Sequence, residues 1–160
     1  MKRIKTWLIT IVVLLCSISA RAHDFEVDGI YYNVTSSTER TVEVTFRGES
    51  LLEYDEYQGV VKIPRIVVYG SREYRVTSIG RGAFYFCSGL TSVTFPEGLT
   101  SIDDKAFCDC DGLTFITLPE GLTSIGSETF RGCSGLVSII LPESLISIGA
   151  NAFHYCVNIQ

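Results

Sequence analysis

Cysteine is the residue type with the most chemical potential in this chain, because a thiol can form a disulfide, bind a metal or act as a nucleophile. Four cysteines recur every 23 residues, namely Cys87, Cys110, Cys133 and Cys156. If these residues lie on adjacent strands, their Cα atoms are about 4.8 Å apart, inside the disulfide range of about 4.4–6.8 Å. Parallel side chains would keep the Cβ atoms near that separation, wider than the usual value of about 3.8 Å. We therefore expect a column of buried free thiols, with disulfides as the open alternative, and we expect Cys108, outside the column, to be exposed.

A metal site is not indicated by these residues. Cys108 and Cys110 are separated by one residue, which is not a typical zinc spacing, and no histidine accompanies them. One stretch also concentrates four carboxylates that could bind calcium, namely Asp103, Asp104, Asp109 and Asp111. They fit no known calcium-loop pattern, so we interpret them as a solvated acidic loop and predict no metal and no cofactor.

Catalytic groups are also not gathered by any motif. The two histidines, His23 and His154, flank nothing that resembles a catalytic triad, and the chain contains no G-x-S-x-G, P-loop or H-E-x-x-H sequence. A serine hydrolase needs a nucleophile, a base and an orienting group together. We therefore predict that the protein is not an enzyme.

The spacing of 23 residues extends to apolar residues, and it defines the elements that hold the cysteines. One column contains Ile79, Ile102, Ile125 and Ile148, and another contains Phe84, Phe107, Phe130 and Phe153. A row of 23 residues cannot bury these side chains alone. Rows that stack side by side bury one another's apolar columns in a continuous core, which is the physical basis of repeat folds.

Each row predicts two short strands and one turn of helix. Val93 and Phe95 alternate with polar residues, as in a half-buried strand, and the following Pro96 ends its hydrogen bonding. A second extended piece covers residues 99–102. Residues 103–110 place apolar side chains at the spacing of a single helical turn. The glycines at the end of each turn, Gly89, Gly112 and Gly135, are expected to adopt positive φ.

The parallel sheet formed by the first strand of each row has an exposed face, and this face is the candidate binding site. Its predicted members are Ser92, Thr94, Phe115, Thr117, Ser138 and Ile140. An exposed Phe115 beside Ile140 favours a contact surface, although isolated exposed apolar residues are also common.

Residues 23–75 are expected to be β-rich and to cap the repeats. Asp28-Gly29 lies between two alternating apolar runs, which favours a hairpin, and a second hairpin is expected over residues 67–76. Another strand is expected around Val42 and Val44, with Phe46 continuing the alternation. Val61 to Pro64 resembles the strand end from Val93 to Pro96, so we expect the first row to start here. The terminal repeat of a stack must cover the end of the core, and we therefore assign a capping role to this region.

Residues 1–22 have the form of a signal peptide: a basic start, an apolar run and a small-x-small site ending at Ala22. We therefore predict cleavage after Ala22 and an exported protein that starts at His23. The alternative is an uncleaved anchor helix, but the apolar run is short for a membrane span. Cys16 lacks the small preceding residue that lipid attachment requires. Cleavage would remove four of the 13 basic residues and none of the 18 acidic residues. The remaining chain would have 9 basic and 18 acidic residues, a net charge of about −9. This charge disfavours nucleic acids and anionic membranes as partners.

The rows resemble the leucine-rich repeats of BspA-like bacterial surface proteins. The shared pattern is L-x-x-I-x-L-P-x-x-L-x-x-I-G-x-x-A-F-x-x-C, carried most specifically by Ile125-Gly126, by residues 148–153 and by the cysteine column. The resemblance covers residues 76–160, about three and a half rows, and departs from the pattern at Asp103, Thr129 and Ser144. It implies a leucine-rich-repeat solenoid behind an N-terminal cap, and a non-catalytic, secreted or cell-surface recognition module for host or neighbouring-cell proteins. A structural spacer in a longer repeat array is the alternative.

The last row is expected to lack a cap. Gln160 aligns with Val137, at the start of a strand, so the row leaves apolar columns and backbone groups uncovered. This arrangement predicts either a fragment of a longer repeat protein or self-association through this end.

Overall fold

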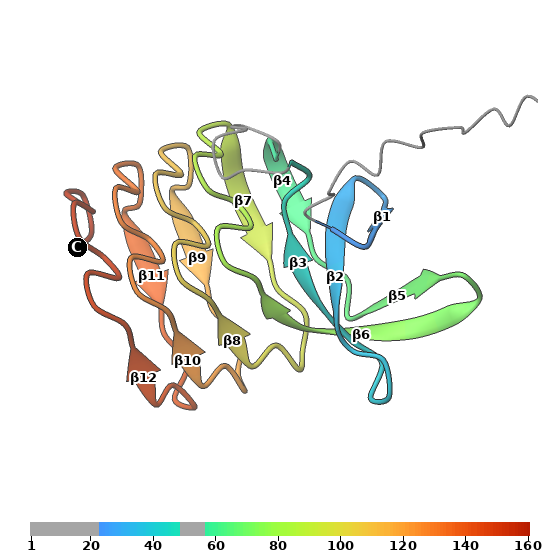
Figure 1. Ribbon diagram of the computed structural model, residues 1–160. Helices are drawn as coiled ribbons and strands as arrows, with labels where there is room; N and C mark the ends of the chain where they lie inside the picture. Colours follow the sequence, from blue (N-terminus) through green and yellow to red (C-terminus); the bar gives the residue numbers. More distant parts are fainter. Residues whose placement is uncertain (1–22, 49–56) are drawn as a thin grey trace, which may run out of the picture.

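The computed structural model describes residues 23–48 and 57–160 (Figure 1). The expected signal peptide, residues 1–22, lies outside this part of the chain. The described residues form strands and turns and contain no helix, and none of their segments is a helix long and apolar enough to cross a membrane. The twelve strands are β1 Phe25–Val27, β2 Ile30–Ser36, β3 Thr41–Thr45, β4 Gly59–Lys62, β5 Ile66–Tyr69, β6 Arg72–Ile79, β7 Leu90–Thr94, β8 Ser101–Ile102, β9 Phe115–Thr117, β10 Ser124–Ile125, β11 Ser138–Ile140 and β12 Ser147–Ile148.

The second strands of the rows form one parallel ladder in the predicted register. β6, β8, β10 and β12 lie next to one another in that order, and Ile79, Ile102, Ile125 and Ile148 are paired in succession. The first three of these isoleucines are buried. Figure 1 shows the successive rows side by side along the molecule. Residues that are 23 positions apart in the sequence therefore lie side by side in neighbouring rows.

The first strands of the rows form two pairs and not the continuous sheet expected from the sequence. β4 pairs with β7, and β9 pairs with β11, both in parallel. β7 and β9 are neighbours, but no ladder joins them. The pairing of Val61 with Val93 confirms that the first row begins near residue 61.

The expected helical turn is wrong: residues 103–110 form successive tight turns. The amide groups of Ala106, Cys108 and Cys110 donate to carbonyls three residues earlier within the row. The intervening amide of Phe107 donates instead to Thr129 O, 2.8 Å away in the next row. The amides of Lys105 and Asp109 also donate to carbonyl oxygens of the next row. Lys105 and Asp109 have positive φ, which aims their amides outward from the row. A helix would aim all these amides along its own axis, so this set of hydrogen bonds between rows would be lost.

The expected positive φ of the glycines at the row ends is also wrong. Gly89, Gly112 and Gly135 all lie outside the left-handed region. A Cβ atom at Gly112 would clash with the carbonyl oxygen of Ser88, and one at Gly135 with that of Asp111. Gly112 and Gly135 are therefore required by close contact with the previous row. The glycines of the Pro-Glu-Gly turns are left-handed instead, Gly98 with φ of 87° and Gly121 with φ of 93°.

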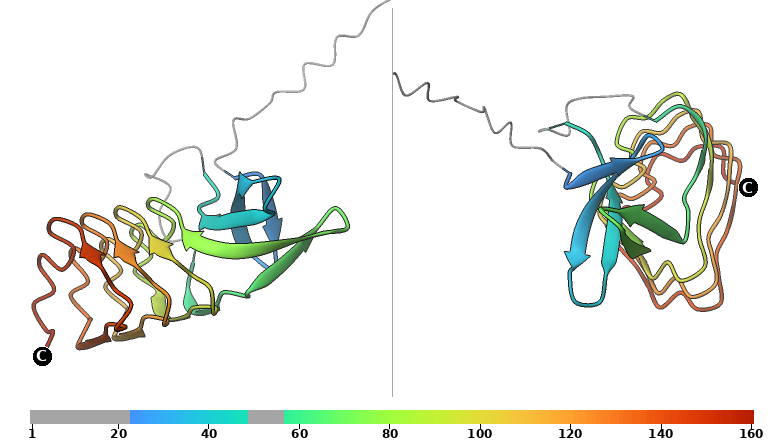
Figure 2. Two further views of the ribbon diagram at one scale, coloured as in Figure 1. Left: turned by 90° about the horizontal axis from the view of Figure 1, so that it is seen from below. Right: turned by 90° about the vertical axis from the view of Figure 1, so that its right-hand side faces the viewer.

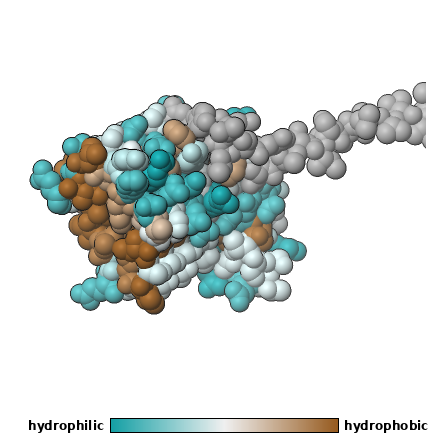
Figure 3. Space-filling model, turned by 60° about the vertical axis from the view of Figure 1, so that its left-hand side comes forward, coloured by the Kyte–Doolittle hydropathy of each residue, from teal (hydrophilic) through white to brown (hydrophobic). Residues whose placement is uncertain are grey.

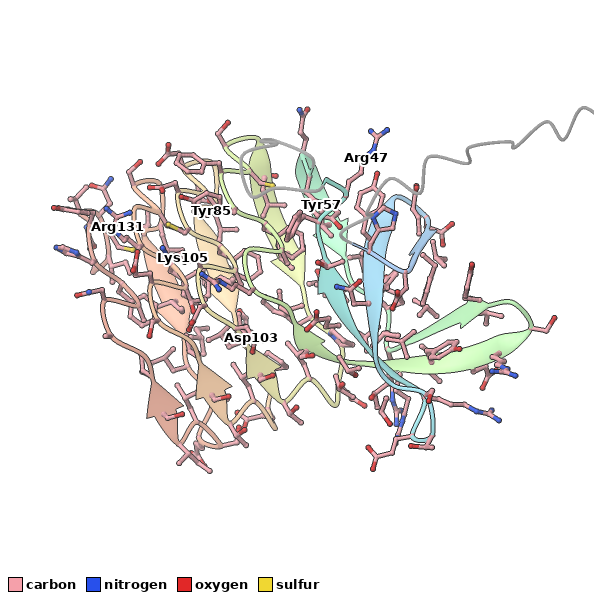
Figure 4. All side chains as sticks on the ribbon, viewed as in Figure 1. Arg47, Tyr57, Tyr85, Asp103, Lys105 and Arg131 are labelled. Atoms are coloured by element: carbon pink, nitrogen blue, oxygen red, sulfur yellow. The ribbon has the colours of Figure 1, made fainter. Side chains whose placement is uncertain are left out.

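The phenylalanine column forms a stack of nearly parallel rings through the core. The centroids of Phe84 and Phe107 lie 4.8 Å apart, those of Phe107 and Phe130 5.4 Å, and those of Phe130 and Phe153 5.5 Å. Tyr57 covers the first ring at 4.6 Å, from the segment that precedes the rows (Figure 4). The stack therefore extends from the N-terminal region through every row.

The N-terminal region contains the predicted hairpins. β1 and β2 pair in antiparallel around Asp28 and Gly29, which have φ of 51° and 76°, and β5 and β6 pair around Gly70 and Ser71. β3 follows β2 in antiparallel and then pairs in parallel with β6, joining this region to the ladder of rows. Phe46 of the expected strand lies just beyond the end of β3. Figure 2 shows β5 and β6 extending beyond the rows as an arm.

Candidate recognition face

The structure places the six predicted face residues on β7, β9 and β11. Thr94, Phe115, Thr117 and Ile140 are exposed, whereas Ser92 and Ser138 are half-buried. Their neighbours Val93 and Ile116 point into the core, as the alternation of side chains along a strand requires. The exposed fractions of Phe115 and Ile140 are 49% and 51%. We call this set of six residues the recognition face.

A groove of about 330 Å³ crosses the recognition face between β7 and β9, where the ladder is interrupted. Four of the six predicted residues line it, together with Val93 and two residues that the sequence reasoning did not include, Phe95 and Pro119. Phe95 is half-buried, and its ring meets that of Phe107 edge-on. The alternation along the strand assigned Phe95 to the core, so only the break in the ladder shows that it also lines a groove.

The groove is uncharged, but a column of carboxylates borders the face at the strand ends. The lining consists of hydroxyl, aliphatic and aromatic side chains with one proline. Each strand of the face is followed by a proline and then an exposed glutamate, namely Glu97, Glu120 and Glu143. A groove of this kind can accept an apolar side chain, and the carboxylates attract a cationic residue beside it.

Phe115 and Ile140 are diagonal neighbours rather than direct partners. In the β9–β11 ladder, Phe115 is paired with Ser138, and Ile140 is paired with Thr117. The exposed apolar surface continues from Ile140 onto Val137 and Leu141, which are 46% and 43% exposed. Figure 3 shows hydrophobic surface collected on this side of the molecule, toward the last row.

The cysteine column contains free thiols that donate hydrogen bonds to the previous row. The Sγ atoms of Cys110, Cys133 and Cys156 lie 2.9, 3.0 and 2.9 Å from the carbonyl oxygens of Phe84, Phe107 and Phe130. Burial raises the pKa of all three thiols. The column therefore links the rows by protonated thiols, and reactive thiolates are disfavoured there.

The expected exposure of Cys108 is wrong, because its side chain is only 1% exposed. Its Sγ lies 3.2 Å from Asp109 Oδ2. Burial and the neighbouring Asp109 together raise its pKa to about 12. The position after the phenylalanine is variable among the rows, and the sequence therefore did not show that the tight turns enclose it.

Two of the four clustered aspartates, Asp104 and Asp111, accept hydrogen bonds from the next row. Asp104 Oδ1 accepts a hydrogen bond from the amide of Ser127 at 2.7 Å, and Asp111 Oδ1 accepts one from the hydroxyl of Ser134 at 2.8 Å. Among residues 23–48 and 57–160, no three histidine, cysteine or acidic side chains are arranged to hold a metal ion. Asp104 and Asp111 thus have a structural explanation in contacts between rows.

The two histidines lie far apart in the chain and contact different partners. His23 Nδ1 lies 3.1 Å from the carbonyl oxygen of Arg47, while the His154 ring stacks on Tyr155. In the turns of two adjacent rows, Glu128 Oε2 lies 3.7 Å from Lys105 Nζ of the previous row and 3.8 Å from Arg131 Nε of its own row (Figure 4). These partly exposed ion pairs contribute little to stability.

Comparison with known proteins identifies similar repeats. Residues 69–160 match the model of the BspA type leucine rich repeat region, with six copies. None of the curated proteins matches the sequence. The matched region begins inside the β5–β6 hairpin and includes every strand from β6 to β12.

Several solved structures share the fold. A leucine-rich repeat protein from Bacteroides capillosus is 30% identical, with a TM-score of 0.65, over 78% of this chain and 86% of that one. A leucine-rich repeat protein from T. pallidum is 23% identical, with a TM-score of 0.62, over 84% of this chain and 68% of that one. The pneumococcal vaccine antigen PcpA is 19% identical, with a TM-score of 0.50, over 82% of this chain and 47% of that one. The last two similarities concern the fold alone.

Proposed function

Because this chain belongs to the BspA type leucine-rich repeat family, we propose that it is a non-catalytic module that recognises another protein through its recognition face. The observation that carries the proposal is the groove of about 330 Å³ between β7 and β9, beside the exposed side chains of Phe115 and Ile140. Leucine-rich repeat proteins commonly bind proteins, and extended, regularly spaced surfaces suit that purpose. The fold by itself does not specify the partner.

The chemistry of the recognition face defines the kind of partner. An apolar side chain from the partner would fill the groove beside Phe115, while hydroxyls such as Thr94 and Thr117 offer hydrogen bonds at its border. The column of Glu97, Glu120 and Glu143 favours a lysine or arginine next to that apolar residue. We therefore infer a protein ligand with an apolar anchor and a basic border.

The proposed module is a solenoid with one capped end. Residues 23–75 act as the cap and residues 76–160 as the leucine-rich-repeat rows. The contact of Tyr57 with Phe84 supports the capping role, because it covers the first ring of the core stack. The module acts outside the cell, at the surface or in secreted form, after cleavage behind Ala22. The signal-like residues 1–22 support this location.

A structural role as a spacer is the second candidate, and the last row favours it. Ile146, Ile148 and Val157 are 83%, 47% and 75% exposed there. Such a surface suits contact with a further repeat or with a second copy of the chain. In that case the recognition face would be a solvated surface, and ligand binding would belong to another part of the assembly. Sedimentation of the purified protein over a range of concentrations measures the self-association that this surface predicts.

Substitution at the recognition face separates the two candidates. The binding of fluorescently labelled protein to intact host epithelial cells is measured by flow cytometry, before and after the cell surface is trimmed with protease. Phe115→Glu and Ile140→Glu should each lower saturable, protease-sensitive binding at least about tenfold, because each places a charge against an apolar contact. Val68→Glu is the matched control, since Val68 is equally exposed on a strand, at 57%, but lies on the β5–β6 arm. Saturable binding that survives both face substitutions would support the spacer.

A further inference from the structure

A second hollow lies between the β1–β2 turn and strand β4, beside the recognition face, since Val60 and Lys62 of β4 are paired with Ser92 and Thr94. It has a volume of about 370 Å³, within the usual size range of ligand pockets. Its lining includes Asp28 and Ile30 from the hairpin, and Val60 and Lys62 from β4. Its walls therefore combine apolar side chains with one acid and one base.

One side chain that lines this hollow has an unsatisfied polar group. Tyr32 is 0% exposed, and its hydroxyl has no hydrogen-bond partner among residues 23–48 and 57–160. A buried hydroxyl without a partner costs about 1–3 kcal/mol, so such groups are rare unless a ligand or a water completes them. Burial, with the Asp28 charge as a smaller cause, raises the pKa of Tyr32, so the phenol is a neutral hydrogen-bond donor. Asp28 therefore lies near this donor and offers an acceptor.

Strand β4 contributes free backbone groups beside the hollow. The amides of Gly59 and Ile63 donate to Gly89 O and Thr94 O on the side of β7. Successive backbone groups of a strand point in opposite directions, so the N–H and C=O of Val60 and Lys62 point to the other edge of β4. No described strand pairs with that edge. Val60 is also 71% exposed, which leaves the edge accessible.

We propose that this hollow is a second binding site, for an extended peptide segment that pairs with the free edge of β4 and inserts a glutamine or asparagine side chain toward Tyr32. Strand addition of this kind obtains affinity from backbone hydrogen bonds and selectivity from a side-chain pocket. A side-chain amide matches the two polar groups, because its carbonyl oxygen accepts from the Tyr32 hydroxyl and its NH₂ group donates to the Asp28 carboxylate. A carboxylate in the same place would be repelled by Asp28. The site borders the recognition face, but none of the six residues of that face is in its lining.

Fluorescence anisotropy with short labelled peptides tests this site on the purified protein. The probe is a seven-residue peptide of alternating valine and threonine with a central glutamine, and its comparison peptide has leucine at the centre. We expect the glutamine peptide to bind at least about tenfold more tightly than the leucine peptide, since only the amide satisfies Tyr32. Equal binding of the two peptides, or no change of anisotropy with either, would overturn the proposal.

Two substitutions examine the two halves of the site. Tyr32→Phe removes only the hydroxyl and should abolish the preference for glutamine while the leucine peptide keeps its affinity. Tyr74→Phe is the matched control, because Tyr74 is a similarly buried tyrosine outside the lining of the hollow. Val60→Pro removes an outward N–H from the edge of β4 and should weaken both peptides at least about fivefold; circular dichroism checks that it folds. A preference for glutamine that persists in Tyr32→Phe would contradict the assignment of the amide.

Discussion

The rows and the N-terminal region solve the same packing problem in different ways. In the rows, the same contacts are repeated: each phenylalanine stacks on the next within 6° of parallel, and Cys110, Cys133 and Cys156 each donate to the previous row. In the N-terminal region, each contact occurs once, as in the stacking of Phe25 on Tyr69 and the capping of Phe84 by Tyr57. The rows therefore share their stability among equivalent contacts, whereas the N-terminal region depends on individual residues.

This difference also separates satisfied from unsatisfied polar groups. The row turns satisfy every second amide within the row and the others in the next row, so the turn backbone is largely hydrogen-bonded in the interior rows. The N-terminal region holds the unpaired hydroxyl of Tyr32, and its half-buried Glu43 carboxyl accepts a long hydrogen bond from Asn33 at 3.3 Å. Buried groups that reduce stability are often retained for function. The comparison therefore directs a search for binding toward the N-terminal region as well as toward the recognition face.

The largest effect is expected from interrupting the stack in the middle of the rows. Phe107→Ala removes a ring that is 0% exposed and contacts a ring on each side. It should lower the free energy of unfolding by about 3–5 kcal/mol, which urea denaturation measures. Phe153→Ala is the matched variant, since Phe153 is half-buried at the end of the same column and should cost only about 1–2 kcal/mol. Equal losses of unfolding free energy in the two variants would contradict the expectation that a ring inside the stack contributes more than the ring at its end.

A smaller effect should come from the tyrosine that joins the two regions. The Tyr57 hydroxyl donates to Thr45 O at 2.7 Å and accepts from the Tyr31 amide at 3.1 Å. Tyr57→Phe leaves both partners without that oxygen and should lower the free energy of unfolding by about 1–3 kcal/mol in thermal denaturation. Tyr32→Phe is the control and should leave stability unchanged or slightly higher, because its hydroxyl has no partner to lose. A loss as large in Tyr32→Phe as in Tyr57→Phe would contradict this distinction between the two hydroxyls.

The sequence predicted which residues are equivalent better than it predicted the backbone between them. The isoleucine register, the Asp28-Gly29 hairpin and the start of the first row at residue 61 were all readable, because each depends on spacing or on local turn preference. Residues 103–110 were not, since apolar residues at i, i+1 and i+4 fit both a helical turn and a series of tight turns. The choice depends on hydrogen bonds between rows, such as Phe107 N to Thr129 O, which exist only after stacking.

For the candidate sites, too, the sequence predicted the features that depend on local spacing but not those that depend on contacts between distant segments. Alternation along the strands located the exposed positions of the recognition face, including Phe115 and Ile140. The groove depends on the interrupted ladder between β7 and β9, and the second hollow depends on the meeting of β4 with the β1–β2 turn. Both features join segments that are distant in the sequence. Composition and spacing do not contain that information.

The smallest effect concerns Glu43, where the N-terminal region meets the second row. Burial raises the pKa of this carboxyl above its ordinary value of 4.5, the hydrogen bond from Asn33 at 3.3 Å lowers it in part, and the charge of Asp103 raises it further. Because the folded pKa exceeds the unfolded one, this group does not reduce stability below about pH 4.5, and its cost appears as the pH rises through the folded pKa. Glu43→Gln keeps the contact with Asn33 without the charge.

Glu43→Gln should therefore raise the free energy of unfolding at pH 7 by a few tenths to about 1 kcal/mol and leave it unchanged at pH 4. Thermal denaturation at several pH values measures the difference between the variant and the original protein. Glu26→Gln is the control, since Glu26 is exposed on β1, and it should change stability little at either pH. A Glu43→Gln variant that is less stable at pH 7 would show that the charge of Glu43 is favourable at this junction. The N-terminal region would then be joined to the rows by an electrostatic contact, and the contrast with the satisfied row turns would no longer hold.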